Sequence, residues 1–157
     1  MRIPKIYLET TIFNHYFDTD REAHFSTVKL FEKIRSEEYE AFTSLYVTDE
    51  LKNAPEPKRT NMLNLIREYN ITILPASDDV GNLANIYIKE GVLPAKFLYD
   101  GLHIAAAAIN DLEYIFSHNF KHINKLKTKV MTSNINFREG YRSVIIASPM
   151  EVFEDEE

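Results

Sequence analysis

The chain has 157 residues, of which 45% are hydrophobic, and a formal net charge of −6. This length suits one domain with a single core, and the absence of cysteine excludes disulfide bonds and thiolate metal sites. The sequence contains no apolar run of membrane-spanning length and no secretory signal pattern, so a cytoplasmic protein is the default expectation.

Five short segments predict β-strands, because each is apolar or β-branched and is bounded by polar or turn residues. They are residues 5–8, 40–43, 71–74, 114–117 and 143–147. The longer stretches between them have helical spacing, and they are residues 22–35, 62–69, 78–89 and 95–110.

Several details support these helices. In the first, Phe25, Val28, Phe31 and Ile34 recur at steps of three and predict the buried stripe. The third follows Ser77, a suitable N-cap, and ends near Gly91, a suitable C-cap. The fourth follows a proline and is rich in alanine, the best helix former.

Strands that alternate with helices indicate an α/β fold with a largely parallel sheet and helices on both faces. Ligands of such sheets bind at the carboxyl ends of the strands. Glu9 directly follows the first predicted strand, Glu50 lies just after the second with Ser44 available as a cap, and Asn119 follows the fourth. We expect these residues to converge with Asp100, which lies on the alanine-rich helix.

Asp100 lies in a helix that is apolar nearly all round, which indicates a buried element. A buried aspartate is costly unless it is paired or bound to metal, so a site is the favoured interpretation. A salt bridge to a lysine such as Lys96 is the alternative. Gly101 is expected to allow another backbone to approach closely, and His103 lies one turn along on the same side.

The other two acids are less distinctive. Glu9 fits either a cation ligand at a strand end or a helix cap. Glu50 lies beside Asp49, and only one of two adjacent helical residues can face inward, so spacing does not choose between them. Separated carboxylates suit Mg²⁺ or Mn²⁺, which prefer oxygen ligands and can activate water for phosphodiester cleavage.

Charge and histidine spacing add two further observations. Five of the 24 acids lie in the last seven positions, so the rest of the chain carries 19 acids against 18 Lys and Arg. Four lysines lie within residues 121–129 with no acid among them, which fits either a phosphate-binding stripe or a solvated helix face. His118 and His122 have zinc-protease spacing, but residue 119 lacks the glutamate base, so we discount a zinc site.

Taken together, four segments resemble the PIN-domain family of ribonucleases and, within it, the VapC-like toxins of toxin–antitoxin pairs. The segments are residues 6–13 (IYLETTIF), 48–51 (TDEL), 93–105 (LPAKFLYDGLHIA) and 114–123 (YIFSHNFKHI). The resemblance implies a three-layer α/β/α fold with a mainly parallel five-stranded sheet in residues 1–150, followed by an acidic tail over residues 151–157.

The resemblance also implies a Mg²⁺- or Mn²⁺-dependent endoribonuclease that acts on RNA, forms homodimers and is blocked by an antitoxin. The implied metal ligands are Glu9, Glu50 and Asp100, with Asn119 in the place of the last acid. Thr11 and His103 would support the site, and Lys121 and Lys125 would bind RNA. Two positions depart from the family pattern, because Glu9 replaces the usual aspartate and Asn119 is neutral.

That departure at Asn119 motivates the main alternative, a PIN-like RNA- or protein-binding module that has weak catalysis or none. A third alternative is a metal-dependent phosphatase or DNA nuclease, because the fold alone does not fix the substrate.

Overall fold

The computed structural model describes residues 2–153. Strands and helices alternate along the chain, as the sequence predicts. In order they are β1 (Lys5–Leu8), α1 (Thr10–Phe17), α2 (His24–Arg35), β2 (Glu40–Ser44), α3 (Leu45–Leu51), α4 (Lys58–Glu68), β3 (Thr72–Leu74), α5 (Asp78–Lys89), the 3₁₀ helix η1 (Ala95–Phe97), α6 (Leu98–Ile109), β4 (Tyr114–Phe116), α7 (Leu126–Arg138), β5 (Ile145–Ala147) and α8 (Pro149–Phe153).

The five strands form one sheet in the order β3-β2-β1-β4-β5, and every neighbouring pair is parallel. The first strand is therefore central: Tyr7 pairs with Phe42 on one side, and Leu8 pairs with Phe116 on the other. The strand order reverses between β1 and β4, which is the point where ligands bind in open parallel sheets. All five carboxyl ends lie along the same edge.

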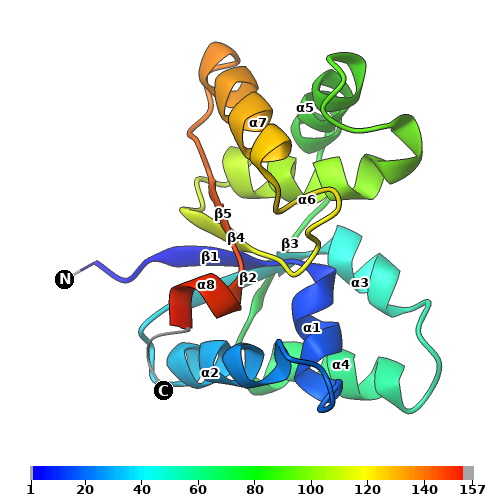
Figure 1. The fold of residues 1–157 in the computed structure, drawn as a ribbon, viewed down its shortest axis with the longest axis vertical. Coiled ribbons are helices and arrows are strands. Elements are labelled where there is room, and N and C mark those ends of the chain that lie inside the picture. Colours follow the sequence, from blue (N-terminus) through cyan, green and yellow to red (C-terminus); the bar gives the residue numbers. More distant parts are fainter. Residues whose placement is uncertain (1, 154–157) are drawn as a thin grey trace.

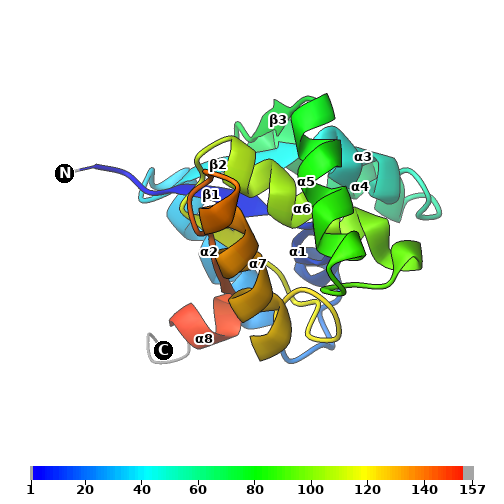
Figure 2. The ribbon, with the colours of Figure 1, turned by 90° about the horizontal axis from the view of Figure 1, so that it is seen from above.

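Helices cover both faces of the sheet, which gives the predicted three layers (Figure 1). Helices α5, α6 and α7 lie on one face, and α1, α2, α4 and α8 lie on the other. The view from above agrees, with α5, α6 and α7 nearest the viewer (Figure 2). Helix α6 is the most deeply buried, since all its residues from Gly101 to Ala108 are buried, as its apolar sequence predicts.

The predicted caps are observed at both ends of α5. The Ser77 side chain accepts a hydrogen bond from the Val80 amide and so satisfies one open donor of the first turn. Gly91 has φ +84°, the left-handed conformation in which glycine ends a helix without a Cβ clash. Ser44 caps α3 in the same way, by accepting from the Val47 amide.

Two local predictions were wrong. The buried stripe of α2 contains Thr27, Leu30, Phe31 and Ile34, whereas Phe25 is 58% exposed and Val28 is only half-buried. The helix is rotated because Thr27 faces inward and hydrogen-bonds to buried His118. Gly101 does not serve a close backbone approach, because an added Cβ would meet only side-chain atoms at an ordinary 3.7 Å.

Core packing continues beyond residue 150. Glu151 lies in helix α8, where it accepts from the Ser148 amide, and Phe153 is 2% exposed against Tyr39 and Phe116. The predicted boundary at residue 150 therefore falls inside a helix, and residues 154–157 of the predicted tail lie outside the described residues. Within residues 2–153, no helix has the length and apolarity needed to cross a bilayer.

Candidate active site

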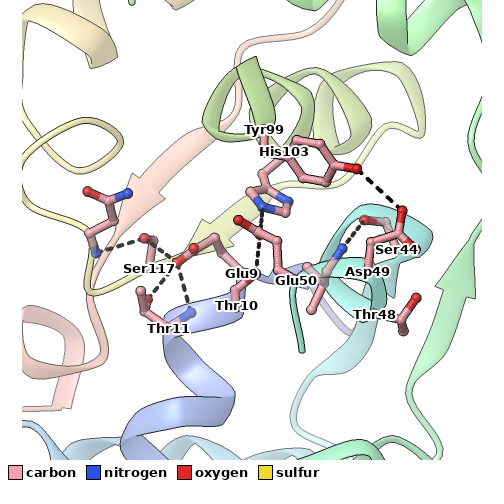
Figure 3. Close-up of polar contacts among 12 residues, drawn as sticks. Glu9, Thr10, Thr11, Ser44, Thr48, Asp49, Glu50, Tyr99, His103 and Ser117 are labelled. Carbon is pink, nitrogen blue, oxygen red and sulfur yellow. Dashed lines mark hydrogen bonds and ion pairs between the residues drawn. The ribbon is translucent and has the colours of Figure 1, made fainter. Parts of the chain in front are cut away.

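Glu9 occupies the centre of the carboxyl edge, directly after β1 and at the N-cap of α1. Its side chain is held through Oε1, which accepts from Thr11 Oγ1 at 2.5 Å, Thr11 N at 3.3 Å and Ser117 Oγ at 2.7 Å (Figure 3). The residue is 3% exposed. Oε2 accepts no hydrogen bond from residues 2–153, so this oxygen is available for a ligand.

The donors to Glu9 are themselves held by the loop after β4. Thr11 Oγ1 accepts from the His118 amide at 2.8 Å, and Ser117 Oγ accepts from the Asn119 amide at 2.9 Å. Each hydroxyl therefore accepts one backbone hydrogen bond and donates its proton to the carboxylate. This arrangement fixes the rotamer of Glu9 and ties β1 to β4 at the point where the strand order reverses.

Glu50, and not Asp49, faces this edge of the sheet. Its Oε1 accepts from Thr10 Oγ1 at 2.5 Å and from His103 Nε2 at 2.6 Å. Asp49 is exposed, and from the part of the chain that the structure describes it accepts only a 3.4 Å hydrogen bond, from the Tyr99 hydroxyl. The structure thus decides the orientation that the spacing of two adjacent acids left open.

A buried chain of hydrogen bonds lies behind Glu50. His103 is fully buried, its Nδ1 is 2.7 Å from the Tyr7 hydroxyl, and that hydroxyl is 2.7 Å from Ser44 Oγ. When His103 is neutral, Ser44 donates to Tyr7 and Tyr7 donates to Nδ1; when His103 is protonated, the direction reverses. In both states Nε2 donates to Glu50, so the chain holds the carboxylate in one orientation.

The ion pair between Glu50 and His103 changes the pKa of both residues. Burial alone would raise the pKa of Glu50, but the hydrogen bond and charge of His103, with a hydrogen bond from Thr10, lower it below its ordinary value. Burial alone would lower the pKa of His103, but Glu50, Glu9 and Asp100 together raise it. Three acids therefore act on one buried imidazole, and the site favours positive charge.

Asp100 lies in the first turn of α6, three residues before His103, and is half-buried. The pKa of its carboxyl is raised from 3.8 to about 6, mainly by burial and also by the charges of Glu9 and Glu50, against the lowering effect of the charge of His103. A hydrogen bond from the Asn119 side chain lowers it. Within residues 2–153 no ion pair joins Asp100 to the alternative partner Lys96, whose ammonium lies over the Phe97 ring, 5.2 Å from its centre.

These groups fit a divalent cation. Glu9, Glu50 and His103 each offer one ligand atom, and these atoms all lie within 4.8 Å of one another. Carboxylate oxygens suit Mg²⁺ and Mn²⁺. His103 Nε2 donates to Glu50, so this residue orients a carboxylate ligand and does not bind the cation itself. Of the three predicted acids, Asp100 is not a member of this close group, but its charge interacts with those of Glu9, Glu50 and His103.

The two predicted RNA-binding lysines lie after β4, and His118 and His122 have different partners. Lys121 is exposed in the loop after β4, and Lys125 is half-buried at the N-cap of α7. His118 Nε2 is 2.8 Å from Thr27 Oγ1, and its Nδ1 is buried without a partner in the described structure. His122 stacks instead on Phe97, so the two histidines do not form a joint metal site.

Four residues of the site were not predicted to take part: Tyr7, Thr10, Ser44 as a partner of Tyr7, and Ser117. Thr10 and Ser117 were adjacent in sequence to predicted residues, so the signal available was proximity alone. Tyr7 carried no signal, because in a buried strand it is indistinguishable from a core aromatic residue until the fold places Ser44 and His103 beside its hydroxyl.

Neither a family model nor a curated protein sequence matches this chain. Several solved structures resemble it in fold, including the following two. VapC20 of Mycobacterium tuberculosis, a toxin that cleaves the sarcin–ricin loop, has a TM-score of 0.59 at 11% identity, over 78% of this chain and 97% of that one. A chain of VapBC2 from Rickettsia felis, which was solved bound to a DNA fragment from the VapBC2 promoter, has a TM-score of 0.54 at 14% identity. The match covers 92% of this chain and 98% of that one. The predicted PIN-like architecture is confirmed: this chain has the fold of the VapC toxins.

Proposed function

We propose that this protein is a divalent-metal-dependent endoribonuclease and the toxin of a toxin–antitoxin pair. The observation that carries the proposal is the convergence of Glu9 and Glu50 beside buried His103, with the charge of Asp100 coupled to all three, at the edge where a VapC-like sheet changes strand order. Like charges at such short range are unfavourable without a cation, so the cluster is better explained as a metal site than as a structural feature.

In this proposal Glu9, Glu50 and Asp100 hold Mg²⁺ or Mn²⁺. A bound ion supplies charge stabilisation at the phosphate and acidifies a water molecule. Thr11 and Ser117 fix Glu9, and His103 fixes Glu50, so the ligands are oriented before substrate arrives. Asn119 holds Asp100 and orients water, while Lys121 and Lys125 attract the RNA backbone.

The expected partners follow from the same proposal. They are an RNA substrate, an antitoxin that blocks the site, and a second copy of the chain in a homodimer, in the cytoplasm. The likeness to VapC20 and to a chain of the VapBC2 complex supports an RNA-cleaving toxin with an antitoxin partner.

Cleavage of a labelled single-stranded RNA tests the assignment, with an adjacent acid as the matched control. Glu50→Gln is expected to abolish cleavage in Mg²⁺ or Mn²⁺, as is Asp100→Asn, whereas Asp49→Asn is expected to cut normally because Asp49 lies outside the cluster. Undiminished cutting by Glu50→Gln and Asp100→Asn would refute the site. Preferential cutting of DNA of the same sequence would favour the DNA-nuclease alternative.

A second candidate function, a PIN-like binding module, is favoured by one observation. Asn119 is neutral, and both ends of its amide are engaged: Oδ1 accepts from the His122 amide at 3.1 Å, and the side chain hydrogen-bonds to Asp100. Calorimetry with Mn²⁺ separates the two candidates. Absence of Mn²⁺ binding together with retained RNA association would support the binding module.

A further inference from the structure

A stacked pair of rings lies at the rim of the site. The Phe97 ring from η1 and the His122 ring from the loop after β4 have centres 3.8 Å apart and planes inclined by 29°. Both residues are half-buried, so part of each remains accessible. The pair joins two segments that are 25 positions apart in sequence, and the fold holds it in place before any ligand binds.

Three lysines surround this pair. The ammonium of Lys96 is 5.2 Å from the Phe97 ring centre, and Lys96 and Lys121 are both exposed. Lys121 precedes His122 in the chain and Lys125 follows it by three positions. Burial lowers the pKa of His122, and the charges of Lys125, Lys121 and Lys96 lower it further. The stacked rings are therefore the centre of a positive rim beside an acidic metal cluster.

The rim is connected directly to the proposed site. The His122 amide donates to Asn119 Oδ1 at 3.1 Å, and the Asn119 side chain hydrogen-bonds to Asp100. A ligand on the rings therefore lies next to the groups that would hold the metal. Rings that accept a nucleobase and cations that accept phosphates are the two components of single-strand recognition.

We propose that Phe97, His122, Lys96, Lys121 and Lys125 form a nucleotide platform that binds an unpaired nucleotide of single-stranded RNA beside the metal site. The choice of RNA rests on the proposed ribonuclease function. A base that joins the platform extends an existing stack, so no ring has to be ordered on binding. Duplex RNA cannot use the rings in this way, because its bases are already stacked and paired.

Fluorescence anisotropy in EDTA tests the platform without cleavage. The probe is a labelled 12-nucleotide RNA with no self-complementarity, compared with a duplex of the same length. Phe97→Leu is expected to weaken single-strand binding about fivefold or more, the lower end for base–aromatic stacking, and to leave duplex binding unchanged. Phe120→Leu is the matched control, because it removes an exposed ring from the same loop outside the stack.

The lysines are tested by salt dependence. Lys96→Gln is expected to reduce the slope of log affinity against log salt by about 0.7 for the single strand. Phe97→Leu is expected to leave the slope unchanged, since it removes stacking and no charge. Lys89→Gln, at the exposed end of α5, is the control for a remote lysine and should change neither value.

Several outcomes would overturn the platform: equal single-strand affinity for Phe97→Leu and Phe120→Leu, equal losses on duplex and single strand, or no RNA binding in EDTA. If Phe97→Leu does not fold, wild-type protein crosslinked to 4-thiouridine RNA provides the test. Crosslinks at residues 96–97 or 121–125 support the platform, and crosslinks only elsewhere refute it.

The two proposals can fail separately. RNA binding through the platform without any cleavage would refute the ribonuclease function alone, whereas cleavage unaffected by Phe97→Leu would refute the platform alone.

Discussion

Replacing Asp100 with asparagine should make the metal-free protein more stable, although it removes a proposed catalytic group. The Asp100 carboxyl is half-buried beside Glu9 and Glu50, and its pKa in the folded protein is about 6 against an ordinary 3.8. Between these two values the folded chain binds a proton that the unfolded chain releases. Stability is therefore lost as the pH rises from 3.8 through 6, and the full loss remains above pH 6.

The size of this loss follows from the shift. A difference of about two pKa units corresponds to about 3 kcal/mol at most. Because the side chain is partly solvated, screening reduces the expected cost to about 1 to 2 kcal/mol. Asp100→Asn removes the charge and retains an oxygen for the hydrogen bond to Asn119. The variant should therefore gain about 1 to 2 kcal/mol at pH 8 and much less at pH 4.

Urea unfolding in EDTA measures this difference. At pH 8 the midpoint of Asp100→Asn should be higher by roughly 0.5 to 1 M, given an m-value of about 2 kcal/mol/M for a chain of this size. Asp49→Asn, which neutralises the exposed neighbour of Glu50, should show no comparable gain. Saturating Mg²⁺ or Mn²⁺ should stabilise the wild type and not Asp100→Asn, and so reduce or reverse the difference. An equal gain at pH 4 and pH 8, or no gain at all, would refute the electrostatic explanation.

Three further predictions concern the neighbours of the site. Tyr7→Phe leaves His103 Nδ1 and Ser44 without their shared partner, so it should destabilise the fold by about 1 to 3 kcal/mol. It should also weaken Mn²⁺ binding in calorimetry, because Tyr7 holds His103 against Glu50. Unchanged Mn²⁺ affinity would exclude this positioning role. Asn119→Asp should tighten Mn²⁺ binding and destabilise the metal-free fold at pH 8, because it adds charge next to Asp100, and weaker Mn²⁺ binding would contradict this. Burial and the neighbouring charge of His15 lower the pKa of His118 from 6.5 to about 3, so the protein loses stability as the pH falls from 6.5 toward 3. His118→Phe should therefore reduce the loss of thermal stability between pH 7 and pH 4. An unchanged loss over this pH range would contradict the prediction.

Local patterns were sufficient for most of the architecture. The strand 5–8 was predicted with its exact bounds, because a short apolar run between polar residues has few alternatives. The bounds of α5 were also predicted, because Ser77 and Gly91 determine where the backbone can enter and leave a helix. In such segments the information lies within a few neighbouring residues.

The errors arose where tertiary contacts decided between local options. The spacing suggested that Phe25 and Val28 lie on the inward face of α2, but Thr27 lies there instead and hydrogen-bonds to His118, 91 positions away. Gly101 was expected to allow a close backbone approach, and its neighbours are side chains. Neither partner could be identified without the fold.

The same distinction applies to the site. Glu9 could be placed from the sequence, since the residue after a central parallel strand must lie at the ligand-binding edge. The choice of Glu50 over Asp49 depended on the rotation of α3, which brings Glu50 within 2.6 Å of His103 on α6. The role of Tyr7 required three elements to meet, β1, β2 and α6, and no local pattern records such a meeting.

The neutral residue at position 119 is consistent with its place beside Asp100. An aspartate there would face Asp100, whose carboxyl already has a raised pKa, and would increase the repulsion in the metal-free state. The amide of Asn119 instead stabilises the charged form of Asp100 and accepts from His122, so it links the proposed metal site to the proposed nucleotide platform. If the proposed site binds Mn²⁺, asparagine at position 119 is expected to bind it more weakly than aspartate would and to leave the metal-free protein more stable. The opposite effects expected of Asn119→Asp on Mn²⁺ affinity and on metal-free stability follow from these two consequences of one missing charge.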